Sequence, residues 1–274
     1  NMDQYYSTIQ TVICNYDVID LDNGLTSEEG KLFIHIHRLE WDEMPIDTLS
    51  INNITAGFYP FGNFFWDEYN SLRSVYSASP DMKKYTLYLN SLWIGAMLND
   101  ELHTRFSGWY RYPYHTTAPS FFIGPKTEIL HHSIDYLEQW NRTWELTKQE
   151  IKYHKNHWND PGYSPPENIS EWPAHGDEDL GQASHLAPFF DQNSNGYYDP
   201  MKGDYPVIYG DECIFSLYSD WHAGNMPYVE ECLGFEIQKW AYAYNCPNDS
   251  ALQNTIFLHY DLINRSNYTY DNLY

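Results

Sequence analysis

The sequence predicts a mainly β protein with an antiparallel β-sandwich-like architecture and a short helical segment near 128–157. Three observations support this prediction. Apolar residues alternate in several short segments, aromatic residues make up 18% of the chain, and turn-forming residues separate the segments. Tyr and Trp favour the half-buried, pleated surfaces of sheets.

Alternation identifies the strands. Leu32, Ile34 and Ile36 alternate with Phe33, His35 and His37, so a strand is expected over 32–39. Further strands are expected at 85–94, 101–106, 213–217, 235–244 and 256–262.

Two local features refine these strands. Asn99-Asp100 lies between Leu98 and the segment 101–106, as the turn of a β-hairpin would. In 235–244 the apolar residues change parity near Gln238-Lys239, which predicts a β-bulge.

A helix is expected after Pro125. Leu137, Trp140, Trp144 and Ile151 are spaced as on one helix face. Thr147-x-x-Glu150 is a capping box that would start a short helix ending near His157.

Prolines after this helix suggest a boundary. Pro161, Gly162, Pro165 and Pro166 cannot continue a helix or a central strand. We therefore expect an N-terminal mainly β region with a helical end, 1–158, and a second β region, 159–274. One continuous domain is the alternative.

Charge limits the partners. Asp and Glu number 38 against 15 Lys and Arg, which gives a formal charge of -23. This charge repels phosphate backbones, so we expect no nucleic-acid partner. No apolar run is long enough to span a membrane as a helix.

The four cysteines, Cys14, Cys213, Cys232 and Cys246, are too far apart for a C-x-x-C zinc site. Disulfides among the last three and free buried thiols both stay open.

The run 191–199 carries the clearest ligand pattern. Oxygen side chains occupy positions one, three, five and nine, and Gly196 stands at position six, where a calcium loop turns sharply. A carbonyl at position seven would add a further oxygen. The predicted cofactor is Ca²⁺, and the predicted ligands are Asp191, Asn193, Asn195, the Tyr197 carbonyl, Asp199 and Asp204.

The loop departs from an EF-hand at its end. Lys202 stands where the bidentate Glu belongs, and Pro200 forbids an ordinary exiting helix. Asp204 is the expected substitute for that carboxylate. The predicted role is a structural staple, and a metal-free Asx turn is the alternative.

Three other groups could chelate a metal: His35 with His37, His154 and His157 with Asp160, and His175 with Asp177 and Asp179. For each we favour the simpler interpretation, which is a solvated strand face, an exposed helix end and an acidic surface turn.

No catalytic motif is present. The patterns G-x-S-x-G, H-E-x-x-H, G-x-x-x-x-G-K-[ST] and G-x-G-x-x-G do not occur. Two apposed carboxylates would suffice for glycoside hydrolysis, so a cryptic glycoside hydrolase stays among the alternatives.

Several stretches share the pattern of one family. They include Trp-Pro-Ala-His-Gly-Asp (172–177), Leu-Ala-Pro-Phe-Phe-Asp-Gln-Asn-Ser-Asn-Gly-Tyr-Tyr-Asp-Pro (186–200), Gly-Asp-Tyr-Pro (203–206), Leu-Gly-Phe-Glu-Ile (233–237) and Asn-Thr-Ile-Phe-Leu-His-Tyr (254–260). On these stretches the chain resembles a recurring domain of large Bacteroidota surface proteins exported by the type IX secretion system.

The resemblance implies a secreted, extracellular protein at the cell surface, with the type IX machinery or surface-attachment proteins as partners. Similar proteins begin with a signal peptide and end in a cleavable sorting domain, neither of which is found in this sequence. We expect the natural chain to continue beyond Tyr274. Asp47-Thr48-Leu49 and Asp249-Ser250-Ala251 resemble the O-glycosylation pattern of these bacteria, with Thr48 and Ser250 as acceptors.

The expected function is that of a calcium-stabilised cell-surface or filament protein in adhesion or assembly, binding glycans or copies of itself. The alternatives are a carbohydrate-binding module and the cryptic hydrolase. An enzyme is the less favoured interpretation.

Overall fold

The computed structural model describes the backbone of 10–19, 26–36 and residue 73, and the complete residues of the other ranges. Those ranges are 45–67, 74–78, 85–106, 121–127, 136, 139–220 and 232–274. The chain divides into two compact units, Asn1–Glu43 and Met44–Tyr274.

The described part of the first unit is an antiparallel pair of strands, β1 (Gln10–Ile19) and β2 (Thr26–Ile36). It confirms the strand predicted from Leu32 as far as Ile36. Residues 37–39 and the side chains of His35 and His37 lie outside the described part.

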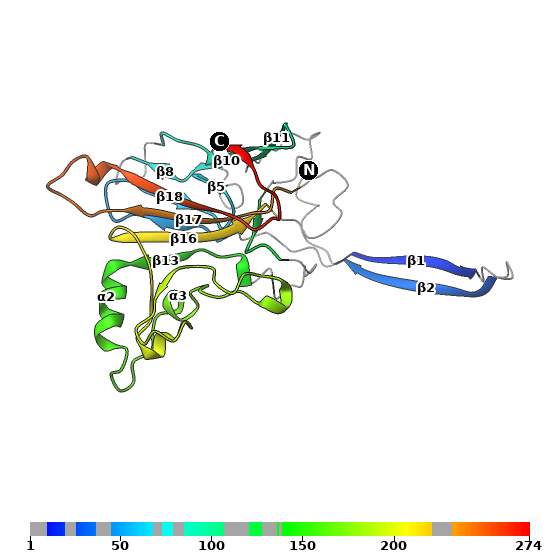
Figure 1. Ribbon diagram of the computed structural model, residues 1–274, viewed down its shortest axis with the longest axis horizontal. Coiled ribbons are helices and arrows are strands. Elements are labelled where there is room, and N and C mark those ends of the chain that lie inside the picture. The colour runs from blue at the N-terminus through cyan, green and yellow to red at the C-terminus, as the bar shows by residue number, and fades with distance from the viewer. Residues whose placement is uncertain are drawn as a thin grey trace. The chain divides into compact units, whose positions relative to one another are not determined.

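The largest sheet of the second unit has five antiparallel strands (Figure 1). The strand order is β12, β16, β17, β18, and β13 also pairs with β16. The bounds are β12 Phe122–Ile123, β13 Trp144–Thr147, β16 Glu212–Ser219, β17 Phe235–Ala243 and β18 Ile256–Asn264.

Smaller sheets complete the unit. One contains β3 (Asp47–Leu49), β4 (Thr55–Phe58), β5 (Asn63–Phe64), β8 (Tyr76–Ser77) and β9 (Asn90–Ser91). Another contains β10 (Trp93–Leu98), β11 (Glu101–Phe106) and β19 (Asp271–Leu273). Two ribbons join β6 (Trp66–Asp67) to β7 (Arg73–Ser74) and β14 (Phe189–Phe190) to β15 (Tyr205–Pro206).

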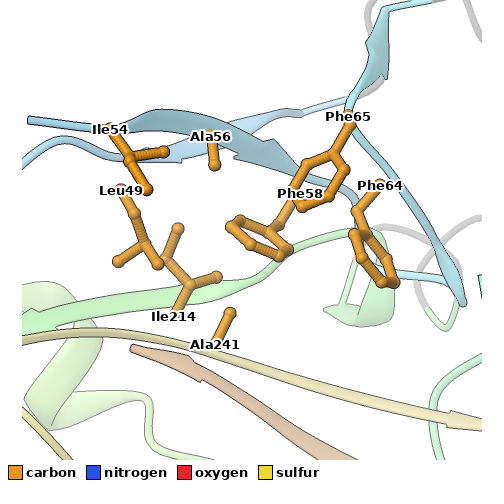
Figure 2. Close-up of a cluster of buried hydrophobic side chains, with 8 residues drawn as sticks. All are labelled: Leu49, Ile54, Ala56, Phe58, Phe64, Phe65, Ile214 and Ala241. Atoms are coloured by element: carbon orange, nitrogen blue, oxygen red, sulfur yellow. The ribbon is translucent and has the colours of Figure 1, made fainter. Parts of the chain in front are cut away.

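One face of the large sheet forms the core with the smaller sheets. Figure 2 shows the buried side chains of β3, β4 and β5 pointing toward Ile214 of β16 and Ala241 of β17. A second cluster joins Ile94 and Ala96 of β10 to Tyr218 and Ile237 of the large sheet. This facing arrangement confirms the mainly β, sandwich-like prediction.

The opposite face of the large sheet is covered by helices and loops. Trp172 packs on Phe215 at 4.7 Å between ring centroids, and the Gln238 amide donates to the Leu186 carbonyl at 2.8 Å. The helices of this layer are α2 (Lys148–His157), α3 (Glu167–Ser170) and the 3₁₀ turns η2 (Glu178–Leu180) and η3 (Pro200–Lys202). A further 3₁₀ turn, η4 (Leu252–Asn254), precedes β18.

Two local predictions are confirmed. Asn99 and Asp100 both have positive φ, as a two-residue hairpin turn between β10 and β11 requires. Thr147 caps α2, and the Thr147 and Glu150 side chains form the reciprocal bonds of a capping box.

The helical periodicity is only partly right. Trp144 lies in β13, where it pairs with Phe215, and it belongs to no helix. Its spacing from Ile151 matched a helix because β13 leads directly into α2, so buried residues of two different elements fell at helical intervals.

The predicted β-bulge near Gln238 is wrong. β17 pairs without a register shift with β16 on one side and with β18 on the other. The apolar pattern changes parity because both faces of β17 are covered, and the polar residues Gln238 and Lys239 are themselves buried. A strand buried on both faces has no reason to alternate.

The boundary expected between 158 and 159 falls inside the second unit. β13, which precedes it, and β16, which follows it, pair in the same sheet.

Candidate metal centre

The strands β14 and β15, which flank the predicted calcium loop, pair with each other and hold its two ends together. Phe189 pairs with Pro206 and Phe190 with Tyr205, and the rings of Phe190 and Tyr205 stack at 4.8 Å. The chain from 191 to 204 therefore leaves and returns at one point.

Alternate side chains of the loop bond back to its own backbone. Asn193 Oδ1 accepts the Asn195 N–H at 3.1 Å, and Asn195 Oδ1 accepts the Tyr197 N–H at 2.8 Å. Asp191 Oδ2 accepts the Gly196 N–H at 2.7 Å. Gly196 has a φ of 80°, a backbone conformation that favours glycine.

Asp191 carries the observation that points to a ligand. Its Oδ1 is shielded from solvent and has no hydrogen-bond partner among the described residues. The Gly196 N–H is the main cause that lowers the pKa of Asp191, and the N–H groups of Asn195, Ser194 and Asn193 lower it further, so this carboxyl is ionised. A shielded anionic oxygen without a partner is costly unless a cation or water completes its bonding.

Asp199 and Asp204 close the far side of the loop. Asp199 Oδ1 accepts the Met201 N–H at 3.1 Å, and Asp199 Oδ2 pairs with Lys202 Nζ at 2.9 Å. Asp204 is fully buried and accepts the N–H groups of Gln192 at 2.9 Å and Asp199 at 2.7 Å. Asp204 thus joins the two ends of the loop, and its role as a metal ligand stays a prediction.

α2 supports the loop from behind through His154, a role that the sequence reasoning missed. His154 Nε2 donates to the Asp204 carbonyl at 2.9 Å, and Nδ1 accepts from the Tyr163 hydroxyl at 3.0 Å. Burial lowers the pKa of His154, which fits this neutral, doubly bonded imidazole. His157 bonds to Asp160 at 2.6 Å, and among the described residues His154, His157 and Asp160 do not gather as a metal-binding group.

His175 supports the loop from another side. Its Nε2 accepts the Tyr198 N–H at 3.0 Å, so its Nδ1 carries the proton that is donated to the Ser184 carbonyl at 2.9 Å. Asp177 caps η2 by accepting the Asp179 N–H. This segment is a turn that positions the loop.

The donor set suits calcium better than a soft metal. In the part of the chain that the structure describes, no three His, Cys, Asp or Glu side chains gather as a metal-binding group. The predicted shell combines carboxylates with Asn and carbonyl oxygens, which are hard ligands that Ca²⁺ accepts in flexible geometry. The ionised, unpartnered Asp191 Oδ1 is where such a cation would bind first.

The cysteines and the acceptor sites have different surroundings. Cys213 and Cys246 are free thiols, and Cys213 is buried. Thr48 lies half-buried within β3, whereas Ser250 lies on an exposed turn. Ser250 is therefore the more accessible of the two predicted glycosylation acceptors.

A group of carboxyls around Glu145 forms a second electrostatic feature. Burial, followed by the nearby charges of Asp47, Glu212 and Glu150, raises the pKa of Glu145 to about 7. Burial also raises the pKa of Asp47, whose carboxylate accepts from the Thr143 hydroxyl. Glu212 is committed to the structure, since its Oε2 accepts the N–H groups of Ser50 and Ile51.

Comparison with known family models, curated proteins and solved structures finds no match for this chain. Within the described residues, no helix has both the length and the apolar character needed to cross a bilayer.

Proposed function

We propose that this chain is a calcium-stabilised, secreted protein of the bacterial cell surface that acts in adhesion or assembly, with the 191–204 loop as its structural calcium site. The observation that carries the calcium assignment is the shielded, unpartnered Oδ1 of Asp191. The stretches in 172–274 that resemble type IX cargo support the location and the export machinery as a partner.

The ion would neutralise the carboxylate charges of the loop and would coordinate oxygens that have no hydrogen-bond donor within it. Asp191, Asn193, Asn195, Asp199 and the Tyr197 carbonyl would hold it. Lys202 would have to release Asp199 Oδ2, because its ammonium now occupies that carboxylate. An extracellular site can be weak and still be filled at millimolar calcium.

Thermal unfolding in calcium and in excess EDTA tests this site. We expect calcium to raise the midpoint by about 5 °C in the wild type, since an ion that binds only the folded state stabilises it. Asp191→Asn should abolish the rise, because it removes the charge and retains an oxygen that can accept the Gly196 N–H.

Asp177→Asn is the matched control. It neutralises an exposed Asp that caps a neighbouring turn outside the loop, so it should retain the full calcium response. Equal midpoints of the wild type in calcium and EDTA would refute the metal site and leave the loop as an Asx turn.

A carbohydrate-binding role is the second candidate. Exposed aromatic side chains on β10 and in the segment that precedes it favour this role. Trp93 is 73% exposed, and its ring lies 5.4 Å from that of Phe106 on β11. Tyr88 is 61% exposed and lies 6.4 Å from Trp66. Exposed rings of this kind can stack on the apolar faces of sugars.

Titration calorimetry with neutral oligosaccharides tests this candidate. Trp93→Ala should abolish binding, whereas Tyr197→Ala, which removes a similarly exposed ring elsewhere, should not. Binding that survives Trp93→Ala would exclude this surface.

A further inference from the structure

β18 is an open edge of the large sheet. It pairs with β17 over its whole length, and no other described strand pairs with it. Its side chains are mostly half-buried, as expected for a strand covered on its faces and open at one edge.

Hydrogen bonds just beyond the strand ends show which backbone groups of β18 point away from β17. The Asp220 N–H donates to the Phe235 carbonyl at 3.0 Å, so odd-numbered residues of β17 bond to β16. The Arg265 N–H donates to the Gly234 carbonyl at 2.8 Å, so odd-numbered residues of β18 bond to β17. The outward N–H and C=O groups therefore belong to the even-numbered residues Ile256, Leu258, Tyr260, Leu262 and Asn264.

These outward groups have no hydrogen-bond partner among the described residues. β18 also lacks the usual protection of an edge. It contains no proline and no lysine, and its only acidic residue is Asp261. A long edge strand without such residues is a template for pairing with another chain.

We propose that β18 pairs antiparallel with β18 of a second copy of this chain, about a two-fold axis at Tyr260. This inference rests on the proposed assembly function and names the surface that serves it. In this register Leu258 faces Leu262, Phe257 faces Ile263, and His259 faces Asp261. Each contact occurs twice because the interface is self-complementary.

Neighbouring registers place less compatible side chains opposite one another. Centring the axis on His259 places Phe257 opposite Asp261 and one imidazole opposite the other. Centring it on Asp261 places two carboxylates directly opposite, which is destabilising. A shift by one residue turns the buried faces of the two copies to opposite sides of the joint sheet. The sequence of β18 thus specifies the register centred on Tyr260.

His259 and Asp261 are exposed, as the proposed contact between copies requires. The His259 and Asp261 side chains are 41% and 51% exposed, with Nε2 and Oδ1 3.1 Å apart. They would occupy non-hydrogen-bonded positions of the new ladder, where facing side chains lie closest. The formal charge of -23 opposes association, so salt that screens this repulsion should tighten the dimer.

Analytical ultracentrifugation over a range of protein and salt concentrations tests the proposal. We expect a monomer–dimer equilibrium that tightens with salt. His259→Asp places a carboxylate opposite Asp261 at two symmetric positions and should weaken the dimer about tenfold. The exchanged variant His259→Asp/Asp261→His restores opposite pairs and should restore the dimer.

Cysteine pairing tests the register without depending on affinity. In a background with Cys14, Cys232 and Cys246 replaced by serine, His259→Cys mixed with Asp261→Cys should form a disulfide-linked heterodimer. Either variant alone should cross-link much less, because identical positions are offset across the axis.

A wild type that stays monomeric under all these conditions would overturn the proposal, as would a dimer that His259→Asp does not weaken. Calcium-dependent unfolding is measured on the same samples. A calcium shift without dimers would reject the β18 surface and retain the calcium site, whereas dimers without a calcium shift would reject the calcium site alone.

Discussion

The 191–204 loop and the core between the sheets handle polar groups in opposite ways. In the loop, side-chain oxygens bond to nearby N–H groups, and only the Asp191 Oδ1 is shielded without a hydrogen-bond partner among the described loop residues. In the core, Lys239 Nζ, Ser216 Oγ and Tyr218 Oη are buried with no hydrogen-bond partner among the described residues. Hydrogen bonds of polar side chains therefore order the loop, whereas apolar packing orders the core in spite of its buried polar groups.

The largest effect should come from breaking the core itself. Phe58 is fully buried and stacks on Phe64 at 5.5 Å between centroids. Phe58→Ala should lower the free energy of unfolding by about 4 kcal/mol, because it leaves a cavity between the sheets. Urea unfolding should show the same loss in calcium and in EDTA. A loss that depends on calcium would contradict the separation of the two regions.

The next effect should come from the closure of the loop. Asp204→Asn replaces one of the oxygens that accept the Gln192 and Asp199 N–H groups by a donor. The unsatisfied N–H should lower the free energy of unfolding by about 3 kcal/mol in EDTA as well as in calcium. Asp177→Asn is the control, and a loss confined to calcium would instead identify Asp204 as a ligand alone.

Lys239 tests whether polar groups weaken the core. Its Nζ lies 5.3 and 5.2 Å from the ring centroids of Phe58 and Phe64, and burial lowers its pKa to about 7. The unfolded state therefore binds more protons between pH 7 and 10.5, and stability should rise with pH in that window.

Lys239→Met should remove this rise and increase the free energy of unfolding by about 2 kcal/mol at neutral pH. Urea unfolding near pH 7 and near pH 9 measures both effects. Lys152→Met, which alters an exposed lysine of α2, is the control. A destabilised Lys239→Met would mean that the ring contacts hold a charged lysine favourably.

The smallest effect concerns Glu145. Its pKa is raised from 4.5 to about 7, so the folded state binds more protons between these values and stability should fall as pH rises through them. Glu145→Gln mimics the protonated form and should gain about 1 kcal/mol near pH 8, after allowance for solvent screening, and little near pH 5. Thermal midpoints at the two pH values measure this difference, and an equal gain at both would contradict the assignment.

Local signals made much of the fold predictable. Two features depend only on residues that are close in the sequence, and they could therefore be predicted. They are the capping box of Thr147 and Glu150 and the Asn99-Asp100 turn. The alternating strands at 101–106 and from 213 onward follow for the same reason, whereas of the strand expected at 85–94 only Asn90–Ser91 and the start of β10 form. Trp144 and Lys239 differ because tertiary packing decides their positions. A strand that leads directly into a helix produced helical spacing, and the lysine at the expected bulge lies in the core.

The candidate site was predictable only in part. The spacing of Asp191, Asn193 and Asn195 located the loop, because side chains at alternate positions converge. His154 could not be assigned, since its contact with Asp204 joins residues 50 positions apart. The salt bridge of Lys202 to Asp199 was also hidden, although Lys202 marked the departure from an EF-hand.

The most direct test of the central claim is a calorimetric titration of calcium into protein that has been stripped with EDTA. We predict saturable binding of one ion per chain by the wild type and by Asp177→Asn, and none by Asp191→Asn. Absence of binding by the wild type at millimolar calcium, or full binding by Asp191→Asn, would contradict the account.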